Sequence, residues 1–86
     1  MVRDISMLVP MIMSAAQIEQ LIKTSSPLIN DVVLVDFFEK KEWHDQKSFT
    51  FRITLLDQTK PLTAEVTDAT INQVIKKLQH LGAQIR

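Results

Sequence analysis

The clearest pattern in the chain is a strict alternation of polar and apolar residues from position 48 to position 55. The apolar positions are Phe49, Phe51, Ile53 and Leu55, and the polar positions are Ser48, Thr50, Arg52 and Thr54. A period of two is typical of a β-strand with one buried and one solvated face. The alternation therefore predicts a half-buried strand at the centre of the fold.

A second strand is predicted just upstream, at about residues 29–40, which contain a mostly apolar run. On this strand we expect a buried set, Val33, Val35 and Phe37, and a set beside the polar face, Leu34, Asp36 and Phe38. An exposed ring next to a carboxylate and hydroxyl groups can stack an unpaired base. The same combination is also common on ordinary sheet surfaces.

Two helices are predicted from their capping residues and apolar spacing. Ser14 precedes residues 15–24, and Gln17 stands three positions later at the spacing of a capping box. Thr63 is the expected N-cap of a second helix, and Gly82 follows this helix where a left-handed C-cap belongs. The apolar stripe of the second helix consists of Ile71, Val74, Ile75, Leu78 and Leu81.

Short strands are predicted at residues 3–9 and 83–86. The resulting order, β-α-β-β-α-β, is the α+β ferredoxin-like arrangement, a four-stranded antiparallel sheet with two helices on one face. Residues 41–46 contain neither Gly nor Pro, which predicts a longer connector between the second and third strands rather than a tight turn. By parity the open face carries Asp4, Ser6, Asp36, Phe38, Ser48, Thr50 and Arg52.

Composition indicates one ordinary globular domain over residues 1–86, with 45% hydrophobic and 23% charged residues. The formal charge of zero provides no global field for a polyanion, so any nucleic-acid contact must be local. The chain has no cysteine, which fits a reducing compartment, and we expect a cytoplasmic location. The apolar residues 5–13 are too few to span a bilayer, so no membrane partner is expected.

Three aromatic or imidazole side chains invite other interpretations. Trp43 could cover the helix layer, contact RNA or dock on another domain, and we expect the first of these. His44 and His80 lie far apart in sequence and have no partner at ligand spacing, so no metal site is expected.

Five segments together resemble the ferredoxin-fold anticodon-binding domain, which is the C-terminal domain of the beta subunit of bacterial phenylalanyl-tRNA synthetase. They are VRDIS at 2–6, VDFF at 35–38, KSFTFRI at 47–53, LT at 62–63 and GAQIR at 82–86. The resemblance covers nearly the whole chain, with its pieces in the right order and close to the right spacing. It implies that the chain is the C-terminal piece of a much larger protein.

This resemblance implies a binding role rather than a catalytic one. In that family the synthetase, an ATP- and magnesium-dependent ligase, joins phenylalanine to tRNA(Phe) in its alpha subunit. The domain itself needs no cofactor and grips the anticodon stem and loop. Its partners would be tRNA(Phe), the other domains of the beta subunit and the alpha subunit.

The resemblance also assigns candidate RNA-binding residues. The family's anticodon contacts match Asp36, Phe38 and Ser48, with phenylalanine at the position where the family usually has tyrosine. Arg52 and Lys47 are further candidates for phosphate or sugar contacts, chosen by placement. No catalytic and no metal-binding residue is assigned.

Two other function classes occur on ferredoxin-like folds. A ferredoxin-like acylphosphatase needs a phosphate-cradling loop with an arginine after the first strand, and residues 9–13, VPMIM, offer neither. A ferredoxin-like small-ligand sensor or dimerisation module usually carries a glycine in that loop, which is absent here. The sensor or protein-interaction module remains the alternative to RNA binding.

Overall fold

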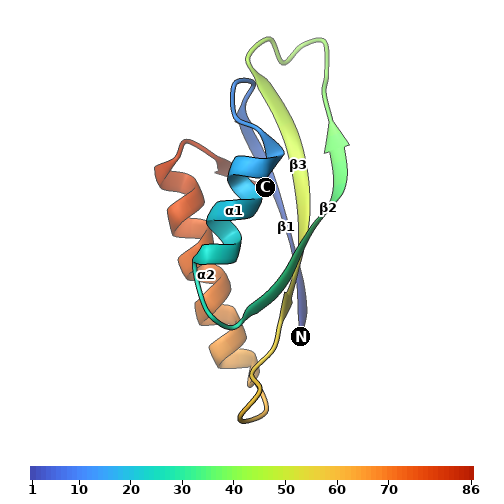
Figure 1. Ribbon diagram of the computed structural model, residues 1–86. Coiled ribbons are helices and arrows are strands. Elements are labelled where there is room, and N and C mark those ends of the chain that lie inside the picture. Colours follow the sequence, from blue (N-terminus) through green and yellow to red (C-terminus); the bar gives the residue numbers. More distant parts are fainter.

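A computed structural model describes residues 1–86, in which six elements follow one another in the order β-α-β-β-α-β. The elements are β1 (Val2–Pro10), α1 (Ala15–Thr24), β2 (Ile29–Phe38), β3 (Gln46–Leu55), α2 (Ala64–His80) and β4 (Gln84–Ile85). The strands form one sheet in the order β2-β3-β1-β4, and every neighbouring pair is antiparallel. Both helices lie on the same face of this sheet (Figure 1). The predicted ferredoxin-like α+β fold is confirmed.

The core lies between the sheet and the two helices. All four apolar positions of the alternating segment in β3 are buried, as predicted. They pack with apolar residues of β1 and of both helices, among them Ile5, Met7, Val9, Ile18, Ile22, Val74 and Leu78. The central strands β1 and β3 therefore supply one continuous apolar layer. The alternate residues of these strands face away from the helices.

Both helices begin with the predicted N-cap residues, and the predicted glycine follows the second helix. The Ser14 hydroxyl accepts the Gln17 N–H at 3.2 Å, and Gln17 Oε1 accepts the Ser14 N–H at 2.9 Å, which completes the capping box. The Thr63 hydroxyl accepts the Val66 N–H at 3.2 Å. Gly82 has a positive φ of 102°, as expected for a left-handed residue after a helix.

The parity predicted for the first half of β2 is wrong. Val32 and Leu34 pair with Ile53 and Phe51 on the helix side, whereas Val33 pairs with Arg52 on the open side. A β-bulge between Leu34 and Asp36 is the cause, because it adds one residue and reverses the alternation along the strand. Beyond the bulge, Asp36 and Phe38 lie on the open face, as predicted. Phe37 lies on the helix side opposite Phe49, but it is 50% exposed, and Val35 in the bulge is 41% exposed, so neither is buried as predicted.

The connector between β2 and β3, residues 39–45, extends past the helix layer at the top of Figure 1. The backbone N–H of Trp43 donates to the Lys40 carbonyl at 3.0 Å and closes a turn within the connector. At its end, the Asp45 carbonyl accepts the Met11 N–H at 2.8 Å. The connector is thus longer than a two-residue hairpin, as predicted, and one hydrogen bond ties it to the loop after β1.

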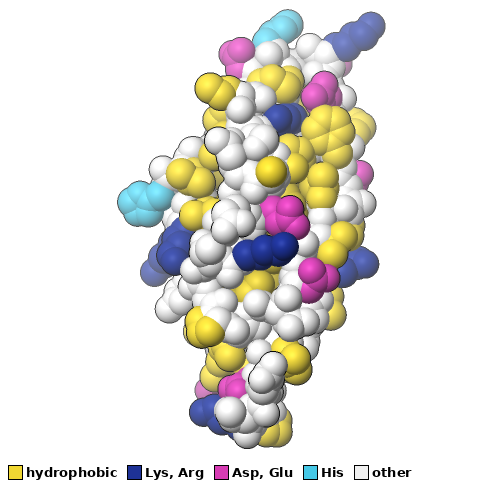
Figure 2. Space-filling model, in the orientation of Figure 1, with side chains coloured by type: hydrophobic (Ala, Val, Ile, Leu, Met, Phe, Trp, Pro, Cys, Tyr) yellow, Lys and Arg dark blue, Asp and Glu magenta, His cyan; other side chains and the backbone are white.

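Charges of both signs are interspersed over the face shown in Figure 2, in keeping with the formal charge of zero. Hydrophobic side chains reach the surface along β2, which is one of the two edge strands of the sheet. No helix in the structure is both long enough and apolar enough to cross a membrane.

Candidate functional site

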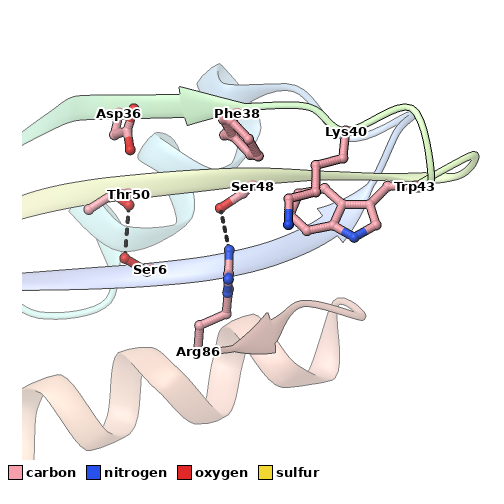
Figure 3. Close-up of a pocket in the computed structure, with 8 residues that line it drawn as sticks. All are labelled: Ser6, Asp36, Phe38, Lys40, Trp43, Ser48, Thr50 and Arg86. Carbon is pink, nitrogen blue, oxygen red and sulfur yellow. Dashed lines mark hydrogen bonds between the residues drawn. The ribbon is translucent and has the colours of Figure 1, made fainter.

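A shallow hollow lies on the open face of the sheet, near the end at which β2 stops and β3 starts (Figure 3). Its volume is about 590 Å³, within the range of about 300–1,000 Å³ typical of ligand sites. The hollow is lined by Ser6, Asp36, Phe38, Lys40, Trp43, Ser48, Thr50 and Arg86. These residues come from all three long strands, the connector and the end of the chain, so only the folded sheet brings them together.

The floor of the hollow is polar because the solvent-facing residues of β1, β2 and β3 lie side by side there. Ser6 pairs with Thr50 across β1 and β3, and their hydroxyl oxygens are 2.8 Å apart in a hydrogen bond that either can donate. Asp36 pairs with Thr50 from the other side, which places its carboxylate at the rim on β2. The floor therefore offers hydroxyl groups and one carboxylate to a polar ligand.

Phe38 forms an aromatic wall of the hollow. It pairs with Ser48, and 47% of its surface is exposed. The Trp43 ring lies against it, with the centroids 5.8 Å apart and the planes at 80°. The expectation that Trp43 covers the helix layer is therefore wrong, because the turn in the connector directs the indole to the open face.

Arg86 was not predicted as a site residue, yet it reaches across the floor of the hollow. Its backbone N–H donates to the Ser6 carbonyl at 2.9 Å, which extends the pairing of β4 with β1. Its Nη1 donates to the Ser48 hydroxyl at 3.4 Å. Ser48 is only 6% exposed, so the hydroxyl predicted to touch RNA lies beneath the arginine.

Lys40 is a second cation of the hollow that was not predicted as a site residue. Its Nζ lies 5.9 Å from the centroid of Phe38 and 5.2 Å from that of Trp43, at cation–π distance from both rings. Arg86 approaches Trp43 similarly, with Cζ 5.7 Å from the ring centroid. Two cations and two rings thus surround the mouth of the hollow.

The other two predicted site residues lie outside this hollow. Arg52 is on the open face, but its Nε and Nη2 donate to the carboxylate oxygens of Asp4 at 3.0 and 3.2 Å. The hydrogen bonds and the charge of Asp4 raise the pKa of Arg52 above its usual value. Lys47 lies on the other side of β3, where its Nζ is 5.2 Å from the ring centroid of Phe49. The structure therefore brings together Asp36, Phe38 and Ser48 but not Arg52 or Lys47.

The arrangement is suited to a flat, polar ligand. A planar group can stack on the ring faces, and the carboxylate can accept hydrogen bonds from N–H donors. The cations can bind a phosphate. No cluster of three or more His, Cys, Asp or Glu side chains close enough to hold a metal ion is found in the chain.

The fold and this face place the chain among the small ferredoxin-like α+β domains whose sheet is covered by helices on one side only. The family model of the ferredoxin-fold anticodon binding domain matches residues 1–86, and the chain belongs to this family. The family resemblance drawn from the sequence motifs is thereby confirmed.

Two curated proteins similar to the chain are both phenylalanine–tRNA ligase beta subunits. The protein from Clostridium acetobutylicum is 34% identical over 87 residues, which cover 98% of this chain. The protein from Listeria monocytogenes is 35% identical over 89 residues, which cover all of it. The match takes up 11% of the length of each relative, so the chain spans a small part of them.

Proposed function

We propose that this chain binds the anticodon stem and loop of tRNA(Phe) as part of a phenylalanine–tRNA ligase beta subunit. The family and the two relatives support this assignment. The observation that carries it is the uncovered sheet face on which Phe38 and Asp36 border one hollow. Single-stranded RNA is commonly read by such a face, because its unstacked bases can lie flat on exposed rings.

Each residue of the hollow has a distinct role in this proposal. Phe38 stacks an unpaired base, and Asp36 accepts hydrogen bonds from the amino or imino edge of a guanine. Ser48 is buried beneath Arg86 and holds the guanidinium over the floor. Arg86 therefore takes over the polar contact with RNA that the family resemblance implied for Ser48.

Binding by the isolated chain is expected to be weak. Its formal charge is zero, so it gains little from neutralising phosphates. Stacking of one base contributes roughly 1–3 kcal/mol, which aids discrimination but does not hold a tRNA alone. We expect a dissociation constant weaker than about 1 μM at physiological salt, within the weak range of nonspecific nucleic-acid complexes.

The domain acts as a binding module rather than as a catalyst in this proposal. Its hollow contains a single carboxylate, Asp36, and lies open on a sheet surface. Aminoacylation would take place in the alpha subunit with ATP and magnesium. The chain would contribute to the reaction by positioning tRNA(Phe), alongside the other domains of the beta subunit.

The chain offers a matched pair of variants to test this function. Phe37 and Phe38 are adjacent and similarly exposed, at 50% and 47%, but they face opposite sides of the sheet. Binding of a fluorescently labelled anticodon stem-loop RNA is followed by anisotropy. Phe38→Ala should raise the dissociation constant roughly 5- to 150-fold, equivalent to the loss of one stack. Phe37→Ala should change it less than twofold, and equal effects of both variants would contradict the proposal.

One observation favours the alternative of a protein-interaction module. β2 is an edge strand, and its exposed apolar residues Val33, Leu34 and Val35 could pair with the same strand of a second copy. Size-exclusion chromatography with light scattering distinguishes the two functions. A stable homodimer that does not bind the stem-loop would favour the interaction module over RNA binding.

A further inference from the structure

Trp43 is the only tryptophan in the chain and lies in the connector that links β2 to β3. The indole is half-buried and lines the same hollow as Phe38 (Figure 3). Its plane stands at 80° to that of Phe38, with 5.8 Å between the two centroids. The two rings therefore form a corner at the mouth of the hollow.

We propose that Trp43 is the second wall of the base site, so that one unpaired base lies in the corner between Phe38 and Trp43. This inference rests on the proposed RNA-binding function. A base that stacks face to face on one ring meets the other ring edge to face, and both arrangements are favourable for aromatic groups. Such a corner orients the base as well as holding it, because it contacts two perpendicular planes.

The rings at this corner border the open hollow and are approached by an exposed cation. The Lys40 ammonium lies over both rings, 5.9 Å from the Phe38 centroid and 5.2 Å from the Trp43 centroid. Lys40 is exposed, and an exposed cation–π contact is weaker than a stack between a base and an aromatic ring. An incoming base can therefore displace the ammonium from the rings.

Trp43 is held in place although it belongs to a connector. The guanidinium of Arg86 lies 5.7 Å from the centre of the indole, and Arg86 is itself fixed by its contacts with Ser6 and Ser48. The backbone hydrogen bond from the Trp43 N–H to the Lys40 carbonyl also fixes the main chain at Trp43. The wall is thus preformed, which reduces the ordering cost of binding.

The unique tryptophan allows a direct test. The chain is titrated with the anticodon stem-loop RNA while RNA anisotropy and intrinsic tryptophan emission are recorded on the same samples. Stacking of a base on the indole should change the emission in proportion to the bound fraction. Trp43→Ala should raise the dissociation constant by about fivefold or more, and Trp43→Phe should restore most of the affinity. Leu56→Ala, which removes an exposed apolar side chain beyond the far end of β3, is the control and should have no effect.

The outcomes separate this inference from the function on which it rests. An absence of RNA binding to the unmodified chain would contradict the proposed function itself. Normal binding with unchanged emission, together with an unaltered dissociation constant for Trp43→Ala, would overturn the role of Trp43 alone. Backbone amide spectra of the variants show whether the fold is retained, and the emission of the unmodified chain, which has a single tryptophan, keeps the test decisive if Trp43→Ala is misfolded.

Discussion

Nη1 of Arg86 lies 3.4 Å from Oγ of Ser48, so a residue next to the short strand β4 reaches across β1 to the central strand β3. This contact connects the edge of the sheet to the aromatic wall, because the same guanidinium also lies against Trp43. Arg86 is therefore a structural link between the floor and the mouth of the hollow.

The Arg86→Ala variant should lower the affinity for the anticodon stem-loop about fivefold or more, because the floor loses its cation and Trp43 loses its support. Anisotropy titration measures this change. Arg3→Ala is the matched control, since Arg3 carries the same charge but faces the helix side, where it approaches Asp68 of α2 at 3.7 Å. If both variants weakened binding equally, Arg86 would act only through net charge.

The Asp4→Asn variant should strengthen RNA binding. Asp4 holds the guanidinium of Arg52 through two hydrogen bonds, and removing its charge releases a cation on the open face. The slope of log K against log salt should steepen by roughly 0.7, the value for one additional contact with a single-stranded phosphate. Asp68→Asn removes the same charge on the helix side and should leave the slope nearly unchanged. Identical slopes for the two variants would argue against a phosphate contact by Arg52.

The parity of β2 can be tested through stability. Val32 is 2% exposed on the helix side and Val33 is 45% exposed on the open side. Val32→Ala should lower the free energy of unfolding by about 1.5–3 kcal/mol, whereas Val33→Ala should change it by about 0.5 kcal/mol or less. Urea denaturation measures both values. A larger loss for Val33→Ala would mean that the bulge between Leu34 and Asp36 is not present in solution.

Strands and helix ends with a local signal could be predicted from the sequence. The alternation in β3 identified its buried residues, and the caps at Ser14, Thr63 and Gly82 were predicted because each depends on a few neighbouring residues. The first half of β2 could not be predicted in the same way. Its apolar run has no polar residue to mark the solvated face, and a bulge leaves no reliable signal in such a run.

The candidate site was only partly predictable for a related reason. Asp36, Phe38 and Ser48 share a face by strand parity, which is a local property. Lys40 and Trp43 extend from a connector whose turn has no Gly or Pro signature, and their position depends on tertiary packing. Arg86 is placed by the pairing of β4 with β1, which joins residues from opposite ends of the chain.

Stability at acid pH should depend on Asp57. The N–H and the hydroxyl of Thr59 donate to its carboxylate, at 2.9 and 2.8 Å, and these hydrogen bonds hold the pKa of Asp57 below its usual value. The unfolded chain therefore binds a proton at a higher pH than the folded chain does. The resulting stabilisation is complete well above the unfolded pKa of about 3.9 and is lost as pH falls through the lower folded value.

Urea denaturation between neutral and acid pH measures this dependence. The unmodified chain should lose stability below about pH 4 more steeply than Asp57→Asn, which cannot titrate at this position. Equal pH profiles would show that the Thr59 hydrogen bonds do not persist in solution.

In the proposed complex, RNA binds the sheet face opposite the helices. Amide chemical shifts of the ¹⁵N-labelled chain, recorded during titration with the anticodon stem-loop RNA, show which face binds. Progressive shifts are expected at Asp36, Phe38, Thr50 and Arg86, with little change along the exposed side of α2. Shifts concentrated on α1 and α2, with the open face of the sheet unaffected, would contradict the proposed complex.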